Sequence, residues 1–401
     1  MSNFSEDSIK LALGARLGDS LQYFLAEISG KIQLSKTQRE KAEGHYEAVA
    51  DILRSSPPGT LLHRLDVKMI PFGGLGTNTP TKPFLGDEFD LDLIVRINAS
   101  RGLIRSPEIL HRLVLDRLGP LDRYEGKLEL KDRCLRINYA GEFHLDLMSA
   151  VLADDVSSSS TKLWIPERQA DETVVFKLVD PVGLMEWFDA RCALQRIFKV
   201  LNERGDFEAM PLISEDARKS TLRQAVQLVK RMRDSLLRDE KDAKKILKSV
   251  VILTVAGECY GGDTDLARVV SDILNELDRR TSDLWSSSIS NPVHGDEDFL
   301  EPLRHRIDRY LKLRKLIQDM KRDWSQLLAE GLGLERVTAL LDKLFGETVT
   351  ATVFSEYGQR MDEIHRTGRV RMDTSRSAVG ALGLTTASLG VPARAHQFFG
   401  E

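Results

Sequence analysis

Three aspartates are the residues of this chain best suited to hold divalent ions. Asp90 and Asp92 belong to the run DEFDLDLIV, and Asp146 belongs to the later run FHLDLM. Side chains alternate between the faces of a strand, so Asp90 and Asp92 share one face while Leu91 and Leu93 point into the core. If a neighbouring strand supplies Asp146, three carboxylates converge where two divalent ions roughly 4 Å apart would clamp an in-line phosphoryl displacement. The pattern predicts nucleotidyl transfer.

Two adjacent glycines precede the aspartate strand. Gly73 and Gly74 begin the run GGLGTNT, which ends at Thr79. Glycine lets backbone N–H groups approach phosphate oxygens closely, so this loop can cradle the triphosphate whose metal ions the aspartates hold. A hairpin turn beside exposed strand aspartates is the alternative interpretation. The order of the glycines, the Asp-x-Asp pair and the third aspartate makes the combined signal specific.

Local sequence patterns predict the elements that position these residues. Residues 36–54 have apolar residues at helical spacing and no proline, and the run SSPPG ends that helix. A strand at 65–70 leads into the glycine pair. The other elements expected in this half are a helix at 108–118 and strands at 127–130, 135–139 and 142–148. Together they predict a mixed sheet that carries all three aspartates.

The second half of the chain is predicted to be helical. Asp180 precedes Pro181 and is expected to cap the first of these helices. The expected helices span residues 183–202, 215–237, 244–259, 264–281, 299–330 and 334–345. The fold class is therefore α+β, a catalytic lobe with a mixed sheet followed by a helical second lobe.

Four segments follow from these patterns. We expect an N-terminal segment (1–35), a nucleotidyltransferase catalytic lobe with its N-terminal spine helix (36–180), a helical lobe (181–345) and a C-terminal segment (346–401). From Thr367 on, small residues without periodicity predict a flexible tail. The serine-rich segment 153–160 is expected to be a mobile polar loop.

The composition excludes several classes of protein. No apolar run reaches the roughly 20 residues of a bilayer span, and the N-terminus lacks the basic and apolar regions of a signal peptide. We therefore expect a cytoplasmic protein with no membrane partner. Its three cysteines are odd in number and far apart, which argues against a disulfide framework and a structural zinc. The net charge of -4 lacks the basic excess of most nucleic-acid-binding proteins, so no obligatory nucleic acid is expected.

The motifs resemble those of the cGAS/DncV-like nucleotidyltransferases, which include the bacterial CD-NTases of CBASS anti-phage signalling and are relatives of oligoadenylate synthases. The likeness covers roughly residues 36–325. It implies a polymerase-β-like nucleotidyltransferase palm, built on the mixed sheet, plus a helical second lobe, with nucleotides bound in the cleft between them. It rests on IPFGG and the residues through Thr79, on GDEFDLD, on HLDL, on Trp187-Phe188, on the helix 222–234 and on Asn291-Pro292.

The resemblance implies a role for each motif residue. Asp90 and Asp92 would hold two Mg²⁺ or Mn²⁺ ions, and Asp146 would hold one of them beside the attacking ribose hydroxyl. Lys230 matches a lysine that reaches the donor triphosphate, and Ser249 matches a serine that contacts phosphate. From the residues alone, Lys230 is also compatible with a solvated lysine of an amphipathic helix, and Ser249 with an ordinary helix serine.

Two positions depart from the family pattern. Gly74 stands where relatives usually have a serine whose hydroxyl bonds a phosphate. Losing one charge-assisted hydrogen bond of roughly 1.5–3 kcal/mol would weaken nucleotide binding without removing the metal site. Ser149 stands where relatives often have proline after the third aspartate, which implies only a local backbone effect.

The resemblance implies a metal-dependent synthase. It would join ATP or other nucleoside triphosphates into a cyclic di- or trinucleotide, or a short oligonucleotide, that signals to a downstream effector in anti-phage defence. The C-terminal tail is compatible with an activating or conjugating protein partner. The alternatives are a template-independent RNA or tRNA nucleotidyltransferase, an antitoxin-type transferase that modifies a protein, and a catalytically weak nucleotide-binding regulator.

Overall fold

The computed structural model describes residues 17–84, 88–139, 141, 143–153, 161–202, 219–240, 243–329 and 331–366. It also describes three short strands near the C-terminus, β10 (Arg371–Met372), β11 (Leu384–Thr385) and β12 (Val391–Pro392), which pair in one small sheet. The predictions for Gly86, Asp87, segment 154–160 and most of the tail lie outside these residues. Within the described chain, no helix is long and apolar enough to cross a membrane.

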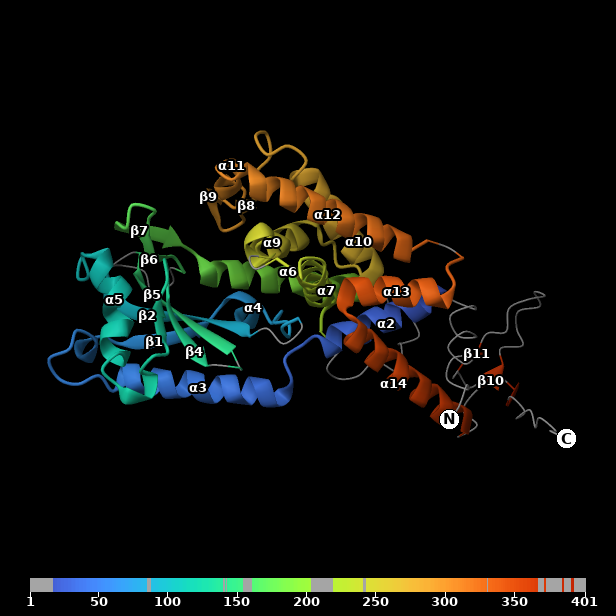
Figure 1. The fold of residues 1–401 in the computed structure, drawn as a ribbon, viewed down its shortest axis with the longest axis horizontal. Helices are drawn as coiled ribbons and strands as arrows, with labels where there is room; N and C mark the ends of the chain where they lie inside the picture. Colours follow the sequence, from blue (N-terminus) through green and yellow to red (C-terminus); the bar gives the residue numbers. More distant parts are fainter. Residues whose placement is uncertain are drawn as a thin grey trace.

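The described residues contain one mixed sheet of seven strands (Figure 1). Its order is β1-β2-β5-β4-β3, and β6 pairs with both β5 and β7. β2 and β5 run parallel, whereas the other neighbours run antiparallel. The strands are β1 (Val67–Pro71), β2 (Phe89–Ser100), β3 (Leu128–Leu130), β4 (Leu135–Tyr139), β5 (Phe143–Leu152), β6 (Leu163–Arg168) and β7 (Val174–Val179).

One face of this sheet is covered by two helices. α3 (Lys36–Arg54) starts at a capping box made by Ser35 and Gln38, and α5 (Pro107–Leu118) starts at the cap residue Ser106. Both helices share a hydrophobic core with the alternate residues of β2 and β5, among them Leu91 and Leu93 as predicted. The side chains of Asp90 and Asp92 must therefore lie on the opposite face, which is the face left open toward the helical half (Figure 1).

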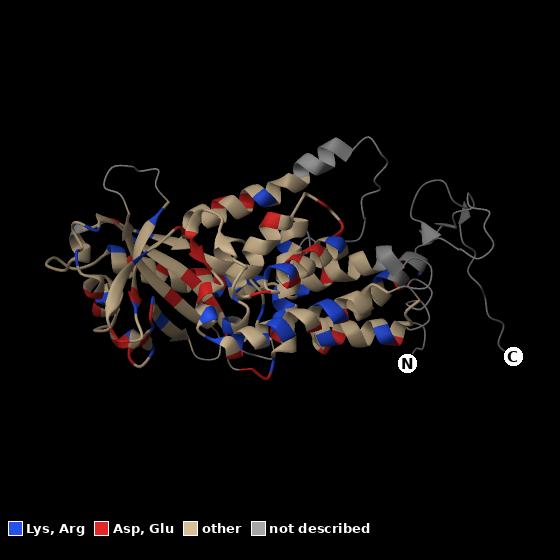
Figure 2. Ribbon diagram, turned by 90° about the horizontal axis from the view of Figure 1, so that it is seen from above, with Lys and Arg blue, Asp and Glu red and all other residues tan. Residues whose placement is uncertain are grey.

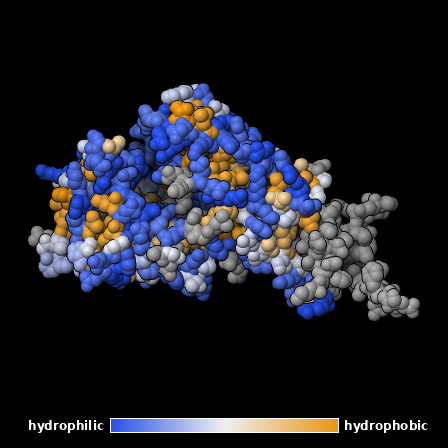
Figure 3. Space-filling view, in the orientation of Figure 1, coloured by the Kyte–Doolittle hydropathy of each residue, from blue (hydrophilic) through white to orange (hydrophobic). Residues whose placement is uncertain are grey.

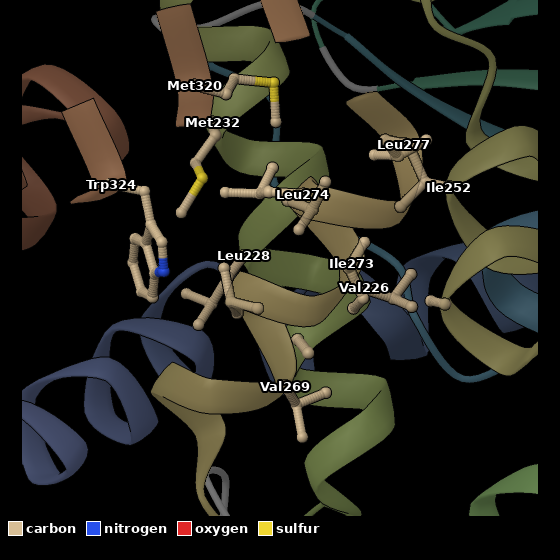
Figure 4. Close-up of a cluster of buried hydrophobic side chains, with 14 of the residues drawn as sticks. Val226, Leu228, Met232, Ile252, Val269, Ile273, Leu274, Leu277, Met320 and Trp324 are labelled. Atoms are coloured by element: carbon tan, nitrogen blue, oxygen red, sulfur yellow. The ribbon is translucent and has the colours of Figure 1, made fainter. Parts of the chain in front are cut away.

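Helices from both ends of the described chain form a bundle around α7 (Thr221–Leu236), which is buried on almost all sides. Figure 4 shows part of its core, where Leu228 and Met232 of α7 pack among Ile273, Leu274 and Trp324 of neighbouring helices. The other members are α2 (Leu17–Lys31), α6 (Pro181–Asn202), α8 (Ala243–Ile246), α9 (Ser249–Cys259), α10 (Leu266–Arg280), α11 (Glu301–Arg304), α12 (Ile307–Leu327), α13 (Leu334–Phe345) and α14 (Glu347–Arg366).

Most of the predicted elements are confirmed, but two predicted helices are interrupted, and α2, α14, β6 and β7 were not predicted. The predicted helix 244–259 is two helices, because the backbone of Lys248 is extended where α9 begins. The predicted helix 299–330 is also broken, at Arg306 between α11 and α12. α14 was not predicted, since its β-branched residues lower helix propensity. It is stabilised by packing of its aromatic side chains against Phe24 of α2.

Candidate active site

The sheet register brings the three aspartates together. Asp92 of β2 is the direct partner of Asp146 in the parallel strand β5, and Asp90 lies two residues earlier on the same face. On the far side of β5, the antiparallel strand β4 places Arg136 directly opposite Asp146. Arg136 donates from Nε and Nη2 to the two oxygens of Asp146, at 2.8 and 2.7 Å, and from Nη2 to Oδ1 of Asp90 at 3.1 Å.

The glycine loop (residues 73–79) lies directly against Asp90, Asp92 and Asp146, which we call the aspartate row. Gly73 begins the short helix α4 (Gly73–Gly76) with a left-handed φ of 58°, and a Cβ atom at this position would lie 2.3 Å from Oδ2 of Asp92. Only glycine allows the loop and the aspartate strand to approach this closely. The hydrogen bonds recorded among the described residues use the N–H groups of residues 76–79 within the turn and leave those of Gly74 and Leu75 for a ligand.

Side chains on and before α7 hold the end of the glycine loop by its carbonyl groups. The donors are spaced about one helical turn apart, so they lie on the side of α7 that faces the loop. They are Lys219 to Asn78 (3.0 Å), Arg223 to Thr77 (3.2 Å), Gln227 to Pro80 (2.7 Å) and Lys230 to Thr79 (2.7 Å). This series joins the helical half of the molecule to the loop that is expected to bind phosphates.

A cleft of about 1460 Å³ lies where the sheet meets the helices. The face drawn in Figure 3 has a hollow there. Figure 2 marks acidic and basic residues on the strands of the sheet and on the helices. All the residues predicted from sequence to act in catalysis or binding line this one cleft, namely Gly73, Gly74, Thr79, Asp90, Asp92, Asp146, Lys230 and Ser249. Their roles stay predictions, but their convergence from distant parts of the chain is a property of the fold.

The surroundings of the three residues expected to contact phosphate differ. Lys230 is 6% exposed and donates to the Thr79 carbonyl, with its Nζ 3.4 Å from where a Cβ of Gly74 would lie. Ser249 Oγ accepts from Nη1 of the buried Arg233 at 3.0 Å. The Thr79 hydroxyl is bonded to that of Thr77 at 2.8 Å and is almost fully buried. Thr79 is therefore better placed to shape the loop than to reach a ligand.

Sequence reasoning missed four residues of the site. Arg136 and Arg233 line the cleft, as do Glu88 and His144, whose Oε2 and Nε2 atoms are 3.0 Å apart beside Asp90. The available signal was alternation. Arg136 lies between the core residues Leu135 and Ile137, and His144 lies two positions before Asp146, so both had to share the aspartate face.

Cys134 is the cysteine nearest to the aspartates. Burial raises the pKa of its thiol, and the negative charge of Asp146 adds to the shift. The thiol is therefore protonated at neutral pH and unsuited to act as a nucleophile or metal ligand, because both roles need the thiolate.

The donor set fits a hard divalent cation. Mg²⁺ and Mn²⁺ prefer carboxylate oxygens, and Asp90, Asp92 and Asp146 supply them from neighbouring positions of two rigid strands. In the part of the chain that the structure describes, however, no three His, Cys, Asp or Glu side chains are already arranged to hold a metal ion. Two of the aspartates instead face the guanidinium of Arg136.

Replacing Lys230 by methionine should weaken binding of a nucleoside triphosphate at least tenfold, because one charge-assisted bond to phosphate is worth roughly 1.5–3 kcal/mol. Gln227→Leu is the matched control. It removes a similar bond from α7 to the loop, but it removes no charge, and Gln227 does not line the cleft. Titration with a non-hydrolysable triphosphate measures the binding affinity of each variant. Equal weakening in the two variants would show that Lys230 only holds the loop.

Comparison with known proteins places these features in context. No protein-family model matches the chain. A protein from Roseivirga ehrenbergii named c-di-GMP synthase is 25% identical over 339 residues, which cover 81% of this chain and 84% of that protein. The likeness thus extends over both the sheet and the helical half.

Solved structures share the fold at lower identity. The CD-NTase CdnG of Bradyrhizobium diazoefficiens, in complex with GTP, is 21% identical with a TM-score of 0.65, covering 85% of this chain and all of that one. CdnC of Escherichia coli, in its complex with HORMA, is 13% identical with a TM-score of 0.55 over 81% of this chain and 96% of that one. The Vibrio cholerae cyclic AMP-GMP synthase DncV, a prokaryotic cGAS homolog, is 16% identical with a TM-score of 0.53, over 80% of this chain and 78% of that one. The predicted resemblance and fold class are confirmed.

Proposed function

We propose that this chain, a nucleotidyltransferase with the fold of the CD-NTases, joins nucleoside triphosphates into a cyclic di- or trinucleotide, or a short oligonucleotide, and releases pyrophosphate. The observation that carries the proposal is the parallel register of Asp92 and Asp146 beside the glycine loop. The cleft volume of about 1460 Å³ supports it, since pockets for one drug-sized ligand are about 300–1,000 Å³. There is room for a donor and an acceptor together.

The reaction needs alignment more than it needs covalent chemistry from the protein. The acceptor ribose oxygen forms a bond to the α-phosphorus of the donor, and the bond from that phosphorus to the bridging oxygen breaks. Pyrophosphate leaves with the electron pair, and the hydroxyl proton passes to water. The backbone N–H groups of Gly74 and Leu75, with the Lys230 ammonium, would hold the donor phosphates.

Asp90, Asp92 and Asp146 would hold two Mg²⁺ or Mn²⁺ ions. When bound, such ions neutralise charge on the phosphates and make the ribose hydroxyl more acidic. The protein's own contribution is to fix the backbone positions of the three carboxylates on two adjacent strands. The anchoring of residues 77–80 by α7 would keep the phosphate loop in register with them.

GTP is the first substrate to test. The similar protein from Roseivirga ehrenbergii is named a c-di-GMP synthase, and the Bradyrhizobium CdnG structure contains GTP. The protein is incubated with each labelled nucleoside triphosphate and Mg²⁺ or Mn²⁺, and products that resist phosphatase are resolved. Failure to form any such product from single or mixed triphosphates would contradict the proposal. Incorporation into added tRNA would favour the polymerase alternative.

Gly74→Ser tests the position of the phosphates in the loop. The site has space for the side chain, because a Cβ there would lie 3.4 Å from Nζ of Lys230 and 3.5 Å from Cα of Pro80. The added hydroxyl should tighten binding of the donor triphosphate roughly tenfold, the effect of one hydrogen bond to a charged group. Fluorescence titration with a labelled triphosphate measures the change. Unchanged or weaker binding would place the phosphates elsewhere.

A protein partner and a signalling role belong to the same proposal. The CdnC structure is a complex with HORMA, and it shares the fold of this chain. We infer that the oligonucleotide product acts on an effector in anti-phage defence and that a regulatory protein controls its synthesis. Comparing product yield with and without an added HORMA protein would test the control.

A further inference from the structure

Arg136 is a cation in direct contact with two of the three aspartates. Its side chain is 22% exposed, and those of Asp146 and Asp90 are 14% and 26% exposed. It bonds both oxygens of Asp146 in the two-pronged geometry of a guanidinium with a carboxylate, and it reaches one oxygen of Asp90 as well. Such bidentate bonds are among the strongest in proteins.

The position of Arg136 is imposed by the sheet. Leu135 and Ile137 on either side of it are buried in the core, so the Arg136 side chain must project onto the aspartate face. The antiparallel register of β4 and β5 then sets it opposite Asp146. The bonds to Asp146 raise the pKa of Arg136, so its charge is permanent.

We infer that the Arg136 guanidinium neutralises the carboxylates of Asp146 and Asp90 and holds them in place until a divalent ion displaces it. The guanidinium occupies one lone pair on each oxygen of Asp146 and offsets the negative charge that would attract a metal ion. It therefore competes with a metal ion for this carboxylate. Arg136 is thus a positioning residue, which acts through Asp146. The inference rests on the proposed function for the nature of the site, but it concerns ion binding without nucleotide.

The described structure supports displacement over simple coexistence. The aspartates are not already arranged as a metal site, even though the strand register sets them side by side. The orientation of Asp90 and Asp146 toward Arg136 accounts for this. A guanidinium beside the site also repels a divalent ion directly.

The test measures Mn²⁺ binding by electron paramagnetic resonance in the absence of nucleotide. Arg136→Gln should bind Mn²⁺ at least about tenfold more tightly than the natural protein, the change expected when a competing charge-assisted bond is lost. The Mn²⁺ affinity of Arg136→Lys should lie between those of the natural protein and Arg136→Gln. An ammonium is a point charge that cannot pair with both carboxylate oxygens at once. The thermal shift produced by Mn²⁺ should increase in the same order.

Arg133→Gln is the matched control. Arg133 also lines the cleft, and it pairs with Glu167 rather than with the aspartates. It removes the same unit of charge, so an equal gain in Mn²⁺ affinity would reduce the effect to overall charge and overturn the inference. Unchanged or weaker Mn²⁺ binding in Arg136→Gln would also overturn it. If Arg136→Gln does not fold, Arg136→Lys replaces it, and unchanged or weaker Mn²⁺ binding in that variant would overturn the inference.

Failure of the inference is distinguishable from failure of the proposed function. If the natural protein forms product and Mn²⁺ affinity does not depend on Arg136, only the inference is wrong. If Mn²⁺ binds to no variant, with or without a triphosphate, both are wrong. Asp92→Asn should abolish Mn²⁺ binding if the three aspartates form the metal site, whether or not the inference about Arg136 is correct.

Discussion

The double variant Asp90→Asn/Asp92→Asn is expected to lose product formation by about 10³-fold or more while keeping its fold. Asparagine preserves the shape of each side chain but removes the charge that a metal ion needs. The several kcal/mol of transition-state stabilisation that a bound metal supplies correspond to a rate factor of this size. Pyrophosphate release measures the loss, and thermal unfolding checks the fold.

The fold should survive because the double variant leaves the strongest ion pair in place. Asp146 keeps both of its bonds to Arg136, and the core face of β2 is untouched. Asp132→Asn is the control, since Asp132 lines the same cleft but lies outside the paired strands. It should retain full activity. Product formation that survives in the double variant would contradict the assignment of the site.

The strands that carry the aspartates were predictable because apolar and polar residues alternate around each aspartate. In β2, the buried residues Leu91, Leu93 and Val95 fix which face holds Asp90 and Asp92. The same reasoning placed Asp146 on a strand, but it did not say which strands were neighbours. The parallel pairing of β2 with β5 depends on contacts between segments about fifty residues apart, and local pattern does not encode it.

The contacts that complete the site were less predictable for the same reason. Lys230 was recognised as a candidate, but its bond to the Thr79 carbonyl joins residues separated by 151 positions. Predicting the position of Arg136 requires the register between β4 and β5 as well as the alternation of β4. The break before α9 depends on an extended Lys248 backbone in a segment whose composition favours a continuous helix.

Gly73→Ala should decrease activity about 10²-fold, although it adds only one methyl group. A Cβ at this position would lie 2.3 Å from Oδ2 and 3.1 Å from Cγ of Asp92, so the carboxylate has to turn away. A displacement of about 1 Å in a reacting constellation is enough to cost a factor of this order. The left-handed φ of 58° adds roughly 1–2 kcal/mol of strain to the folded state.

Gly126→Ala separates the two effects. Gly126 also has a left-handed φ, 70°, but a Cβ there would meet nothing within 4 Å. Both variants should therefore lose roughly 1–2 kcal/mol of unfolding free energy, measured by denaturant titration. Only Gly73→Ala should lose pyrophosphate release and Mn²⁺ binding, because only there does the methyl group displace a carboxylate. Equal activity in the two variants would mean that the closeness of the glycine loop to Asp92 has no part in the chemistry.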